Sequence, residues 1–366
     1  MLEGLKILDL TRILAGPVCT MALGDLGANV IKVERPGAGD ETRGWGPPFD
    51  DRGESAYFLS VNRNKLSVAA DLDAPGDRAL LESLVGEADV VVDNYRPGTL
   101  ERRGIGAAQL RGRHPRLIWC TITGFGPASD RPGYDFVIQA ERGWMSITGE
   151  RDGSPMKVGV ALADVVAGKD AAIAILGALV ARSVSGAGQL VSISLARSAA
   201  AALVNVAQNA LVTGRDAVRW GNAHPNLVPY QLFAAADRPI VVAVGSEAQW
   251  QACVRALDLP ALAEDRELAT NAGRLARRDY VVAALADRLR QKPAVEWTRR
   301  LEAANVPNGV VKTVLETLRE EAASPLTGVA PGVPGTVRLP PPKLDEHGEL
   351  VRAKGWAAFD FLGPRS

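Results

Sequence analysis

An aspartate at the start of a long alanine-rich segment is the residue in this sequence best suited to covalent chemistry. Asp164 precedes VVAGKDAAIAILGALVAR, whose composition and apolar spacing predict a helix. An aspartate in this position is a natural N-cap, and capping is its commoner role. The positive end of a helix also favours an ionised carboxylate, which is the form that a carboxylate nucleophile needs. The two roles are compatible, so we expect Asp164 to be ionised and treat it as a candidate nucleophile.

A basic residue follows a predicted strand at residues 28–34. That strand ends in Glu34, and Arg35 comes next. In dinucleotide-binding sheets an acid at this point favours an unphosphorylated ribose, whereas a nearby arginine accommodates a ribose phosphate. Arg35 therefore suits a ligand with a phosphorylated ribose, although a solvated arginine at a strand end is the more common case.

A second polar group follows the predicted strand at residues 88–94. The segment DNYRPGTLERRG supplies Asn94, Tyr95 and Arg96, with Arg102 and Arg103 close behind. These residues offer an amide, an aromatic face for an adenine ring and several cations for phosphates. The alternative is a strand end that leads into a solvated basic surface.

Strand and helix patterns alternate in the first third of the chain. Short apolar strands are predicted at residues 5–10, 28–34, 65–72, 88–94 and 116–126, with helical patterns between them. This alternation favours an α/β fold with a mostly parallel sheet. The first strand-to-helix junction contains only Gly16, followed by Pro17, so the G-x-G-x-x-G fingerprint of nicotinamide-dependent dehydrogenases is absent.

The rest of the chain has a different pattern. Two long alanine-rich helices are expected between Asp164 and about Gly214, joined through VSGAGQLVSIS. Residues 221–304 combine one clear strand, at 239–245, with charged amphipathic helices, which indicates a smaller second domain. The final part is rich in proline and glycine and is expected to be extended, with a short helix near Glu349.

The composition excludes several classes of protein. The 366 residues include 42 basic and 42 acidic residues, so no bulk charge attracts nucleic acid or an anionic membrane. Three cysteines and three histidines are scattered, which argues against a disulfide framework and a histidine metal site. The N-terminus lacks a signal-peptide pattern, and Lys169 and Asp170 interrupt the most apolar helix. We therefore predict a cytoplasmic protein without a metal.

Several motifs along nearly the whole chain resemble those of the class III CoA-transferases, the carnitine-dehydratase and bile-acid-inducible (CaiB/BaiF) family. They include LDLTRILAGP, LGANVIKVERPGAGDETRGW, NRNKLSVAADL, ADVVVDNYRPGTLERRG, RPGYDFVIQAERGWMSITGE, VGVALADVVAG and GNAHPNLVPYQLF. The resemblance implies an intertwined homodimer with a Rossmann-like large domain, made from both ends of the chain, and a smaller α+β domain. We accordingly predict a large domain at residues 1–215, a small domain at 216–315 and a return to the large domain at 316–366.

The resemblance also implies roles for individual residues. Asp164 matches the family's catalytic aspartate. The expected coenzyme A (CoA) contacts are Leu14, Ala15, Arg35, Ala70, Asp73, Asn94, Tyr95, Arg96, Arg102, Arg131 and Tyr134. CoA and acyl-CoA are substrates in this family, together with small carboxylic acids, and no permanently bound cofactor is implied.

This chain departs from the family pattern in three places. The family often has a lysine near Asp73, which puts one phosphate contact in doubt. The usual V-D-V-S is V-S-I-S here, so Ser192 replaces an acid, and Arg197 stands where an acid is common. These changes could alter local packing, the dimer interface or the activity.

The implied reaction moves CoA from an acyl-CoA donor to a carboxylic acid through an aspartyl-CoA thioester on Asp164. The GNAHPNLVPYQ stretch is similar to relatives that use succinyl-CoA. Two alternatives stay open. The α-methylacyl-CoA racemases of the same family carry His where this chain has Tyr134, and tyrosine is a poor base at neutral pH. The second alternative is a non-catalytic protein that binds acyl-CoA.

Overall fold

The computed structural model describes residues 1–362, which divide into two compact units. The larger unit contains Met1–Met145, Lys157–Arg215 and the chain from Leu318 onward. The smaller unit contains Ser146–Met156 and Asp216–Thr317. Each unit has its own buried core and is described by itself.

The larger unit is built on a six-stranded sheet in the order β3-β2-β1-β4-β5-β6, and every neighbouring pair is parallel. The α/β class and the parallel sheet predicted from the sequence are confirmed. The strands are β1 (Lys6–Leu10), β2 (Asn29–Glu34), β3 (Lys65–Ala69), β4 (Val90–Asp93), β5 (Ile118–Thr123) and β6 (Leu190–Ser194).

Strand β6 lies where the sequence predicted only a connection between two helices. It pairs with β5 along five residues, from Leu190 to Ser194. It is the edge strand, and its residues alternate between serine and apolar side chains, with Leu190 and Ser192 exposed. A short, serine-containing edge strand gives little of the continuous apolar signal that identifies a buried parallel strand.

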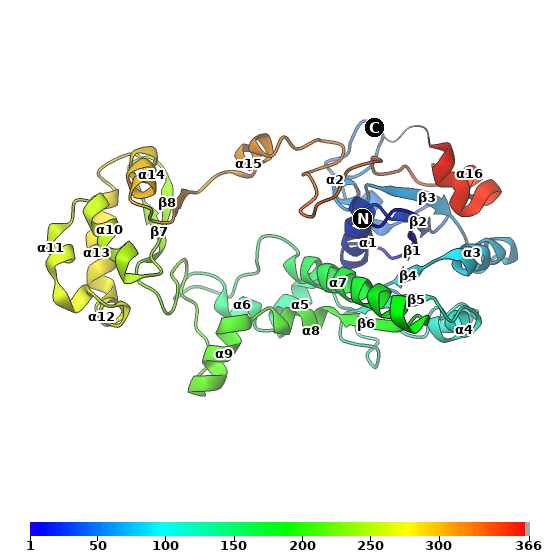
Figure 1. Ribbon diagram of the computed structural model, residues 1–366, viewed down its shortest axis with the longest axis horizontal. Coiled ribbons are helices and arrows are strands. Elements are labelled where there is room, and N and C mark those ends of the chain that lie inside the picture. Colours follow the sequence, from blue (N-terminus) through cyan, green and yellow to red (C-terminus); the bar gives the residue numbers. More distant parts are fainter. Residues whose placement is uncertain (363–366) are drawn as a thin grey trace. The chain divides into compact units, whose positions relative to one another are not determined.

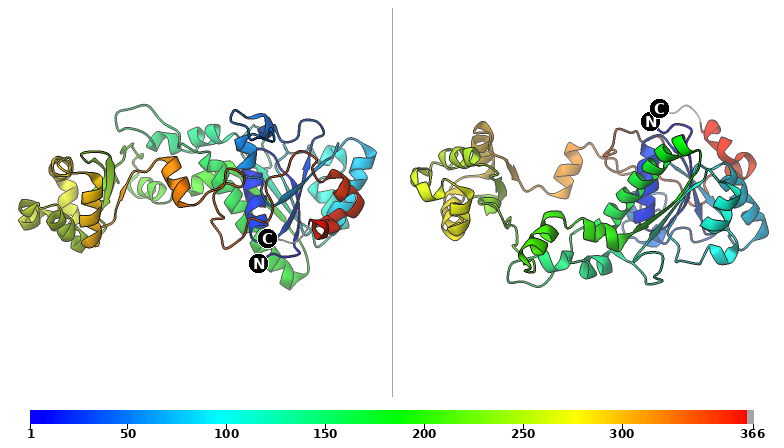
Figure 2. Two further views of the ribbon diagram at one scale, coloured as in Figure 1. Left: turned by 90° about the horizontal axis from the view of Figure 1, so that it is seen from above. Right: turned by 60° about the horizontal axis from the view of Figure 1, so that its bottom comes forward.

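Helices cover both faces of the sheet (Figures 1 and 2). Alternate strand residues point to opposite faces, so Ile7 of β1 packs with the helices of one face and Leu8 with those of the other. The first face carries α1 (Ala15–Asp25), α5 (Asp135–Glu141), α7 (Leu162–Ser185) and α8 (Leu195–Ala201). The second carries α3 (Pro75–Glu87), α4 (Ala107–Arg113), α16 (Gly348–Lys354) and the 3₁₀ segment Gly355–Phe361. The shorter helices of this unit are α2 (Ala56–Leu59) and α6 (Trp144–Ile147), with 3₁₀ turns at Glu41–Gly44 and Glu101–Arg103.

Helices α1 and α7 lie side by side and are in direct contact through Gly168. A Cβ atom at Gly168 would lie 2.5 Å from the backbone oxygen of Ala15, closer than real carbon atoms approach oxygen. Glycine is therefore required there. The contact fixes the helix that carries Asp164 against the loop after β1.

The second predicted alanine-rich helix is broken in the structure. Helix α8 ends at Ala201, and α9 (Val204–Thr213) begins at Val204, which has a φ of +35°. None of the ten residues of α9 is buried, and Val204, Leu211 and Val212 are each at least two-thirds exposed. Alanine-rich composition predicted the helical content but carried no signal for the break.

The smaller unit has a three-stranded antiparallel sheet in the order β7-β8-β9, with helices packed against it. Its strands are β7 (Tyr230–Ala234), β8 (Pro239–Ala243) and β9 (Asn308–Val310), of which only β8 was predicted. Its helices are α10 (Glu247–Ala256), α11 (Pro260–Glu264), α12 (Asn271–Ala276), α13 (Arg278–Leu289) and α14 (Ala294–Ala303), with a 3₁₀ turn at Arg266–Leu268. Helix α15 (Val314–Glu320) spans the boundary between the units. Within residues 1–362, no helix has the length and apolar character needed to cross a membrane.

Candidate active site

Three cavities of the larger unit lie at the carboxyl ends of its parallel strands. The strand order reverses between β1 and β4, and crevices outside such a switch point are the usual ligand sites of open α/β sheets. The edge cavity, of about 610 Å³, is lined by the loops that follow β1, β2, β3 and β4. The central cavity, of about 320 Å³, is lined by the loops that follow β1, β4 and β5. The two share Arg12, Glu41, Tyr95 and Arg96, so they adjoin each other.

Asp164 lines the central cavity and also a third, the aromatic cavity. It is the third residue of α7, and the N-cap position is Ala161, without a side-chain hydrogen bond. The expectation that Asp164 is the N-cap is therefore wrong. No hydrogen bond or ion pair within residues 1–362 engages its carboxylate, which leaves both oxygens available to react.

Asp135 supplies the cap that Asp164 does not. Its Oδ1 accepts a hydrogen bond from the backbone N–H of Ala163 (2.8 Å), and its Oδ2 accepts one from Nε2 of Gln139 (2.7 Å). Gln139 is buried and in turn accepts from the N–H of Val158 (2.9 Å). The G-Y-D motif thus ends in a carboxylate that fixes the start of α7.

Burial raises the pKa of the Asp164 carboxyl to about 7, and the negative charge of Asp135 raises it further in the same direction. The expectation that Asp164 is fully ionised is therefore wrong. Burial and the charge of Asp135 raise its pKa, and they outweigh the stabilising effect of the helix N-terminus on the ionised form. Both the protonated and the ionised form are therefore populated near neutral pH, and the ionised form is weakly solvated. Such a carboxylate is a stronger nucleophile than one in water.

Asn94 binds the backbone of the opposite loop across the switch point. Its Oδ1 accepts from the N–H of Arg12 (2.9 Å), and its Nδ2 donates to the carbonyl oxygen of the same residue (2.7 Å). The side chain therefore acts as a short extension of the sheet between the ends of β4 and β1. Asn94 lines the central cavity, but its amide serves first to hold the loop.

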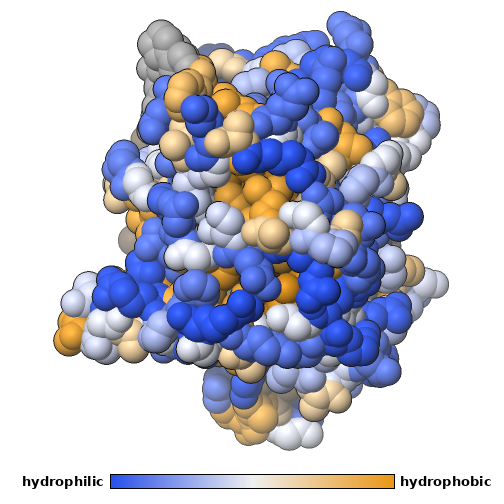
Figure 3. Space-filling view, turned by 90° about the vertical axis from the view of Figure 1, so that its right-hand side faces the viewer, coloured by the Kyte–Doolittle hydropathy of each residue, from blue (hydrophilic) through white to orange (hydrophobic). Residues whose placement is uncertain are grey.

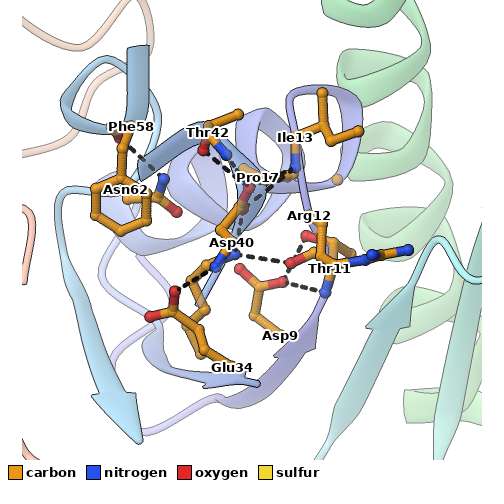
Figure 4. A network of polar contacts seen from close by, with 12 residues as sticks. Asp9, Thr11, Arg12, Ile13, Pro17, Glu34, Asp40, Thr42, Phe58 and Asn62 are labelled. Atoms are coloured by element: carbon orange, nitrogen blue, oxygen red, sulfur yellow. Dashed lines mark hydrogen bonds and ion pairs between the residues drawn. The ribbon is translucent and has the colours of Figure 1, made fainter. Parts of the chain in front are cut away.

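A buried network of charges lies beneath the same loop (Figure 4). Asp9 accepts from the N–H and Oγ1 of Thr11 (2.9 and 2.6 Å) and, through its other oxygen, from Nζ of Lys65 (3.0 Å). Lys32, fully buried, donates to the carbonyl oxygen of Thr11 (2.7 Å) and to Asp40 (3.1 Å). Burial lowers the pKa of Lys65 to about 8 against the opposing effect of Asp9. Such a fully paired network makes the loop rigid.

Asp40 holds Ile13, which lines the central and aromatic cavities beside Asp164. Both carboxylate oxygens accept from the N–H of Ile13 (3.2 Å each), and Ile13 has a φ of +71°. A β-branched residue in this region is strained, so the surrounding bonds must over-determine it. Sequence reasoning missed Asp9, Lys32, Asp40 and Lys65, although charged residues inside apolar strands were the signal that could have found them.

The edge cavity contains two arginines with free guanidinium groups. Arg35 and Arg96 are exposed, line this cavity and have no side-chain hydrogen bond or ion pair within residues 1–362. By contrast, Arg103 forms a two-point ion pair with Asp73 (2.8 and 2.9 Å), and Arg12 pairs with Glu41. Glu34, the strand-end acid, is buried and bound by Arg43 and Ser67.

The other residues expected to contact CoA are divided between these cavities. Ala70, Asp73 and Tyr95 line the edge cavity, and Arg12 lies 5.2 Å from the ring centre of Tyr95. Leu14, Ala15, Asn94, Tyr95, Arg96, Arg131 and Tyr134 line the central cavity with Asp164. Arg102 lines neither of them and lies against Gly98.

Two glycines of the central cavity touch through their backbones. A Cβ atom at Gly124 would lie 2.4 Å from Cα of Gly133, and the reverse substitution would give 2.1 Å. The turn after β5 and the loop before α5 can approach each other only because both residues are glycine. This contact positions Tyr134, the neighbour of Gly133, at the cavity wall.

The aromatic cavity, of about 260 Å³, opens on the other side of Asp164. Four aromatic residues line it: Trp45, Tyr57, Tyr134 and Phe136. The rings of Trp45 and Tyr57 meet edge to face, with their centres 5.0 Å apart. Burial raises the pKa of Tyr57 to about 12, and Asp164 and Asp135 contribute to that rise. Lys157 is the only basic residue among the described residues that line this cavity.

Within residues 1–362, no cluster of three or more His, Cys, Asp or Glu side chains could hold a metal ion. The reactive group that this arrangement presents is the unpaired carboxylate of Asp164, which lines two cavities. The fold and the site define an α/β protein with two unpaired arginines in a cavity at its switch point and an unpaired carboxylate in the adjoining cavity.

The comparisons with known proteins identify the family. The model of CoA-transferase family III matches residues 2–347. The chain is 43% identical to the succinyl-CoA:glutarate CoA-transferase of Mus musculus over 87% of this chain and 74% of that protein. It is 38% identical to the succinate–glutarate CoA-transferase of Agrobacterium fabrum over 96% and 95%. The crystal structure of a CaiB/BaiF family protein from Brucella suis matches with a TM-score of 0.85 and 39% identity, over 96% of this chain and 98% of that one. The chain belongs to CoA-transferase family III and is a CoA-transferase.

Proposed function

We propose that this enzyme transfers CoA between dicarboxylic acids through an aspartyl-CoA thioester on Asp164. The observation that carries this proposal is the unbonded carboxylate of Asp164 at the point shared by the central and aromatic cavities. A carboxylate with a raised pKa that faces two cavities suits a nucleophile that must meet a thioester and an acid in turn.

The proposed reaction begins when an Asp164 oxygen attacks the thioester carbonyl carbon of the acyl-CoA donor. The C–S bond breaks, and a mixed anhydride and CoA thiolate form. The thiolate then attacks the aspartyl carbonyl carbon, which releases the donor acid and leaves the aspartyl-CoA thioester. The acceptor carboxylate attacks that thioester, and the thiolate returns to the acyl carbon, which yields the new acyl-CoA and free Asp164. No net proton or electron is exchanged.

We assign the nucleotide part of CoA to the edge cavity and its thioester end to the central cavity. The free guanidinium groups of Arg35 and Arg96 suit phosphates, and the ring of Tyr95 suits an adenine. The shared residues of the two cavities give the pantetheine arm a continuous path to Asp164. Arg102 and Asp73 remain proposed contacts from the family resemblance, although Asp73 is already paired with Arg103.

We assign the acyl group and the acceptor acid to the aromatic cavity. Aromatic walls suit a methylene chain, and Lys157 can pair with the distal carboxylate of a dicarboxylic acid. The Nζ of Lys157 donates to a backbone oxygen (3.2 Å) and has other donors available. The relatives named for succinyl-CoA and glutarate support this class of substrate.

The arrangement does not favour the racemase alternative. A racemase needs two acid–base groups at the substrate's α-carbon. Tyr134 is 56% exposed and has a phenol in place of an imidazole, and Asp135 is occupied by two hydrogen bonds. The aromatic cavity therefore lacks the pair that α-proton exchange requires.

We also propose that the enzyme is a homodimer, as its family resemblance implies. The face that carries α3, α4 and α16 is mostly hydrophilic, with small apolar hollows (Figure 3). In contrast, α7 and α9 expose several large apolar side chains: Ile173, Val180, Val184, Val204, Leu211 and Val212. A ten-residue helix with no buried residue gains stability when a partner covers it.

Trapping the covalent intermediate tests the proposed function. Incubation with succinyl-CoA followed by borohydride or hydroxylamine should modify Asp164, as peptide mass spectrometry would show. Asp164→Ala should give no adduct while still binding CoA. A wild-type enzyme that transfers CoA but carries no adduct, in experiments where a control thioester is trapped, would contradict the proposal.

A further inference from the structure

A fourth cavity of the larger unit lies beside the edge strand β6, apart from the three cavities around the active site. We call it the arginine cavity. Its volume is about 380 Å³, and none of its residues lines the edge, central or aromatic cavity. Two arginines and two serines line it together with an aromatic ring and small residues: Phe125, Gly126, Pro127, Arg142, Ser192, Ser194, Ala196, Arg197 and Ala200. None of these described residues is acidic.

The first arginine of this cavity is partly buried and incompletely paired. The Nε of Arg142 is buried and has no hydrogen-bond partner in the described chain. Its nearest acid is Glu141, at 4.0 Å, which already binds Arg131 at 2.5 Å. The guanidinium carbon of Arg142 lies 5.6 Å from the ring centre of Phe125. Among the described residues, the charge of Arg142 thus has only one counterion, at 4.0 Å, which it shares with Arg131.

The second arginine, Arg197, has an exposed side chain that forms no hydrogen bond or ion pair within residues 1–362. Its backbone N–H donates to Oγ of Ser194 (3.2 Å), which leaves the hydroxyl hydrogen of that serine free to donate. Ser192 is two residues earlier on β6, so its side chain lies on the same face of the strand. The cavity therefore combines two cations with two hydroxyl donors.

The described chain neutralises the charges of these two arginines poorly. Arg197 has no ion pair within residues 1–362, and Arg142 has only the 4.0 Å pair with Glu141. Two such guanidinium groups at one hollow repel each other unless an anion neutralises them. The cavity therefore favours an anionic ligand.

We propose that the arginine cavity binds a small dianion, either a dicarboxylate or an inorganic phosphate. Both offer the paired oxygens that two guanidinium groups and serine hydroxyls recognise, and either is small enough for this volume. The site does not depend on the proposed reaction, because it shares no residue with the cavities around Asp164. It adjoins them through Ala196, whose N–H donates to the carbonyl oxygen of Gly124 (3.0 Å) in the central cavity.

Equilibrium dialysis of the full-length protein with radiolabelled succinate, and separately with radiolabelled phosphate, tests this site. All variants are made in a Lys157→Met background protein, because this change should weaken succinate binding in the aromatic cavity. Arg142→Met and Arg197→Met should each weaken binding about tenfold or more, as loss of a charged hydrogen-bond partner does. Ser192→Asp should do the same while keeping both arginines. Arg299→Met, which removes an exposed arginine from α14, is the matched control and should bind as the background does.

The relative affinities of the two anions identify the source of the dianion. Phosphate can also bind at Arg35 and Arg96, so the binding that Arg197→Met removes is compared for the two anions. A larger loss for succinate assigns the site to dicarboxylates, and a larger loss for phosphate assigns it to phosphate. The proposal is overturned if neither anion binds the background more tightly than about 10 mM. It is also overturned if Arg197→Met and Ser192→Asp, with unchanged thermal midpoints, bind as the background does.

Discussion

Asp135 caps the helix that carries Asp164, and its charge helps to raise the pKa of the Asp164 carboxyl to about 7. One residue thus fixes the position of the proposed nucleophile and disfavours its ionised form. Burial is the larger cause of the raised pKa. Ionisation of Asp164 is unfavourable because its carboxylate would be weakly solvated and would lie near a second negative charge.

The first prediction concerns the pH dependence of transfer. Only ionised Asp164 can attack a thioester, so kcat/KM should rise about tenfold per pH unit below pH 7 and level off above it. Asp135→Asn removes one of the two causes of the raised pKa and should move the midpoint to lower pH, though not to the value of a free aspartate. Rates measured from pH 5 to 9 with constant ionic strength check this.

The matched control for that experiment is Asp135→Asn combined with Gln139→Glu. In the single variant the NH₂ group of the introduced asparagine would face the NH₂ group of Gln139, and two donors cannot bond to each other. In the double variant the introduced glutamate would accept hydrogen bonds from that asparagine and from the N–H of Val158. The double variant returns a negative charge near Asp164, so its midpoint should move back towards that of the wild type. An unchanged midpoint in the single variant would show that Asp135 does not influence the nucleophile.

The second prediction concerns stability. The pKa of Asp164 is higher in the folded than in the unfolded protein, so the carboxyl group takes up a proton on folding between about pH 4 and 7. Above pH 7 the group is ionised in both states, and its ionised form destabilises the folded protein. Asp164→Asn should abolish transfer and stabilise the protein at pH 8 by up to about 4 kcal/mol, since each pKa unit corresponds to about 1.4 kcal/mol. The gain should fade as the pH falls from 7 towards 4.

Thermal midpoints at pH 8, 6 and 4 measure that effect. Asp170→Asn is the matched control, because it removes the same charge from the same helix without lining the central or aromatic cavity. A variant at position 164 that is less stable than wild type at pH 8 would mean that the carboxylate has a stabilising partner.

The third prediction concerns the ribose phosphate of CoA. Arg35→Met should weaken CoA binding about tenfold or more, because a charged hydrogen bond to phosphate is lost. Dephospho-CoA lacks that phosphate, so its affinity should be nearly equal in wild type and variant. Arg35→Lys should retain part of the preference. Equal losses for the two ligands would place Arg35 against another part of CoA.

Apolar runs predicted five strands of the parallel sheet, since buried strands carry a strong local signal. The strand ends then pointed to the loops that line the edge and central cavities. The proposed role of Asp164 needed the family resemblance, because the neighbouring sequence cannot distinguish a reactive acid at a helix start from a helix cap.

What the sequence could not give depends on contacts between distant residues. Asp135 caps a helix that begins 27 residues later, and Asn94 binds Arg12, 82 positions earlier. Edge strand β6 and the break between α8 and α9 lack a local pattern because partners outside the segment decide them. The raised pKa of Asp164 likewise follows from burial, which local sequence does not show.

The fourth prediction concerns self-association. Replacing Leu211 and Val212 of α9 with lysine should shift the enzyme from dimer towards monomer, because both side chains are about three-quarters exposed and would otherwise be covered by a partner. Val295→Lys, on α14, removes a similarly exposed side chain and should leave the mass unchanged. Sedimentation at several concentrations measures the mass. A wild-type monomer, or a double variant of wild-type mass, would contradict the proposed interface.

The fifth prediction concerns the choice of acid. Lys157→Met removes the only basic residue among the described lining of the aromatic cavity. It should raise KM for succinate as acceptor about tenfold or more, because the distal carboxylate would then lie near Asp135 and Asp164 without a counterion. Propionate has the same chain with no distal charge, so its KM should stay the same or fall.

Lys157→Arg is the matched control, because it keeps the positive charge, and it should preserve the preference for succinate over propionate. Both acceptors are assayed with one CoA donor, so that differences arise at the acceptor step. A parallel rise in KM for both acids would mean that Lys157 shapes the cavity without recognising the second carboxylate. The distal carboxylate would then have to be bound outside the aromatic cavity, and its walls would select only for the length of the methylene chain.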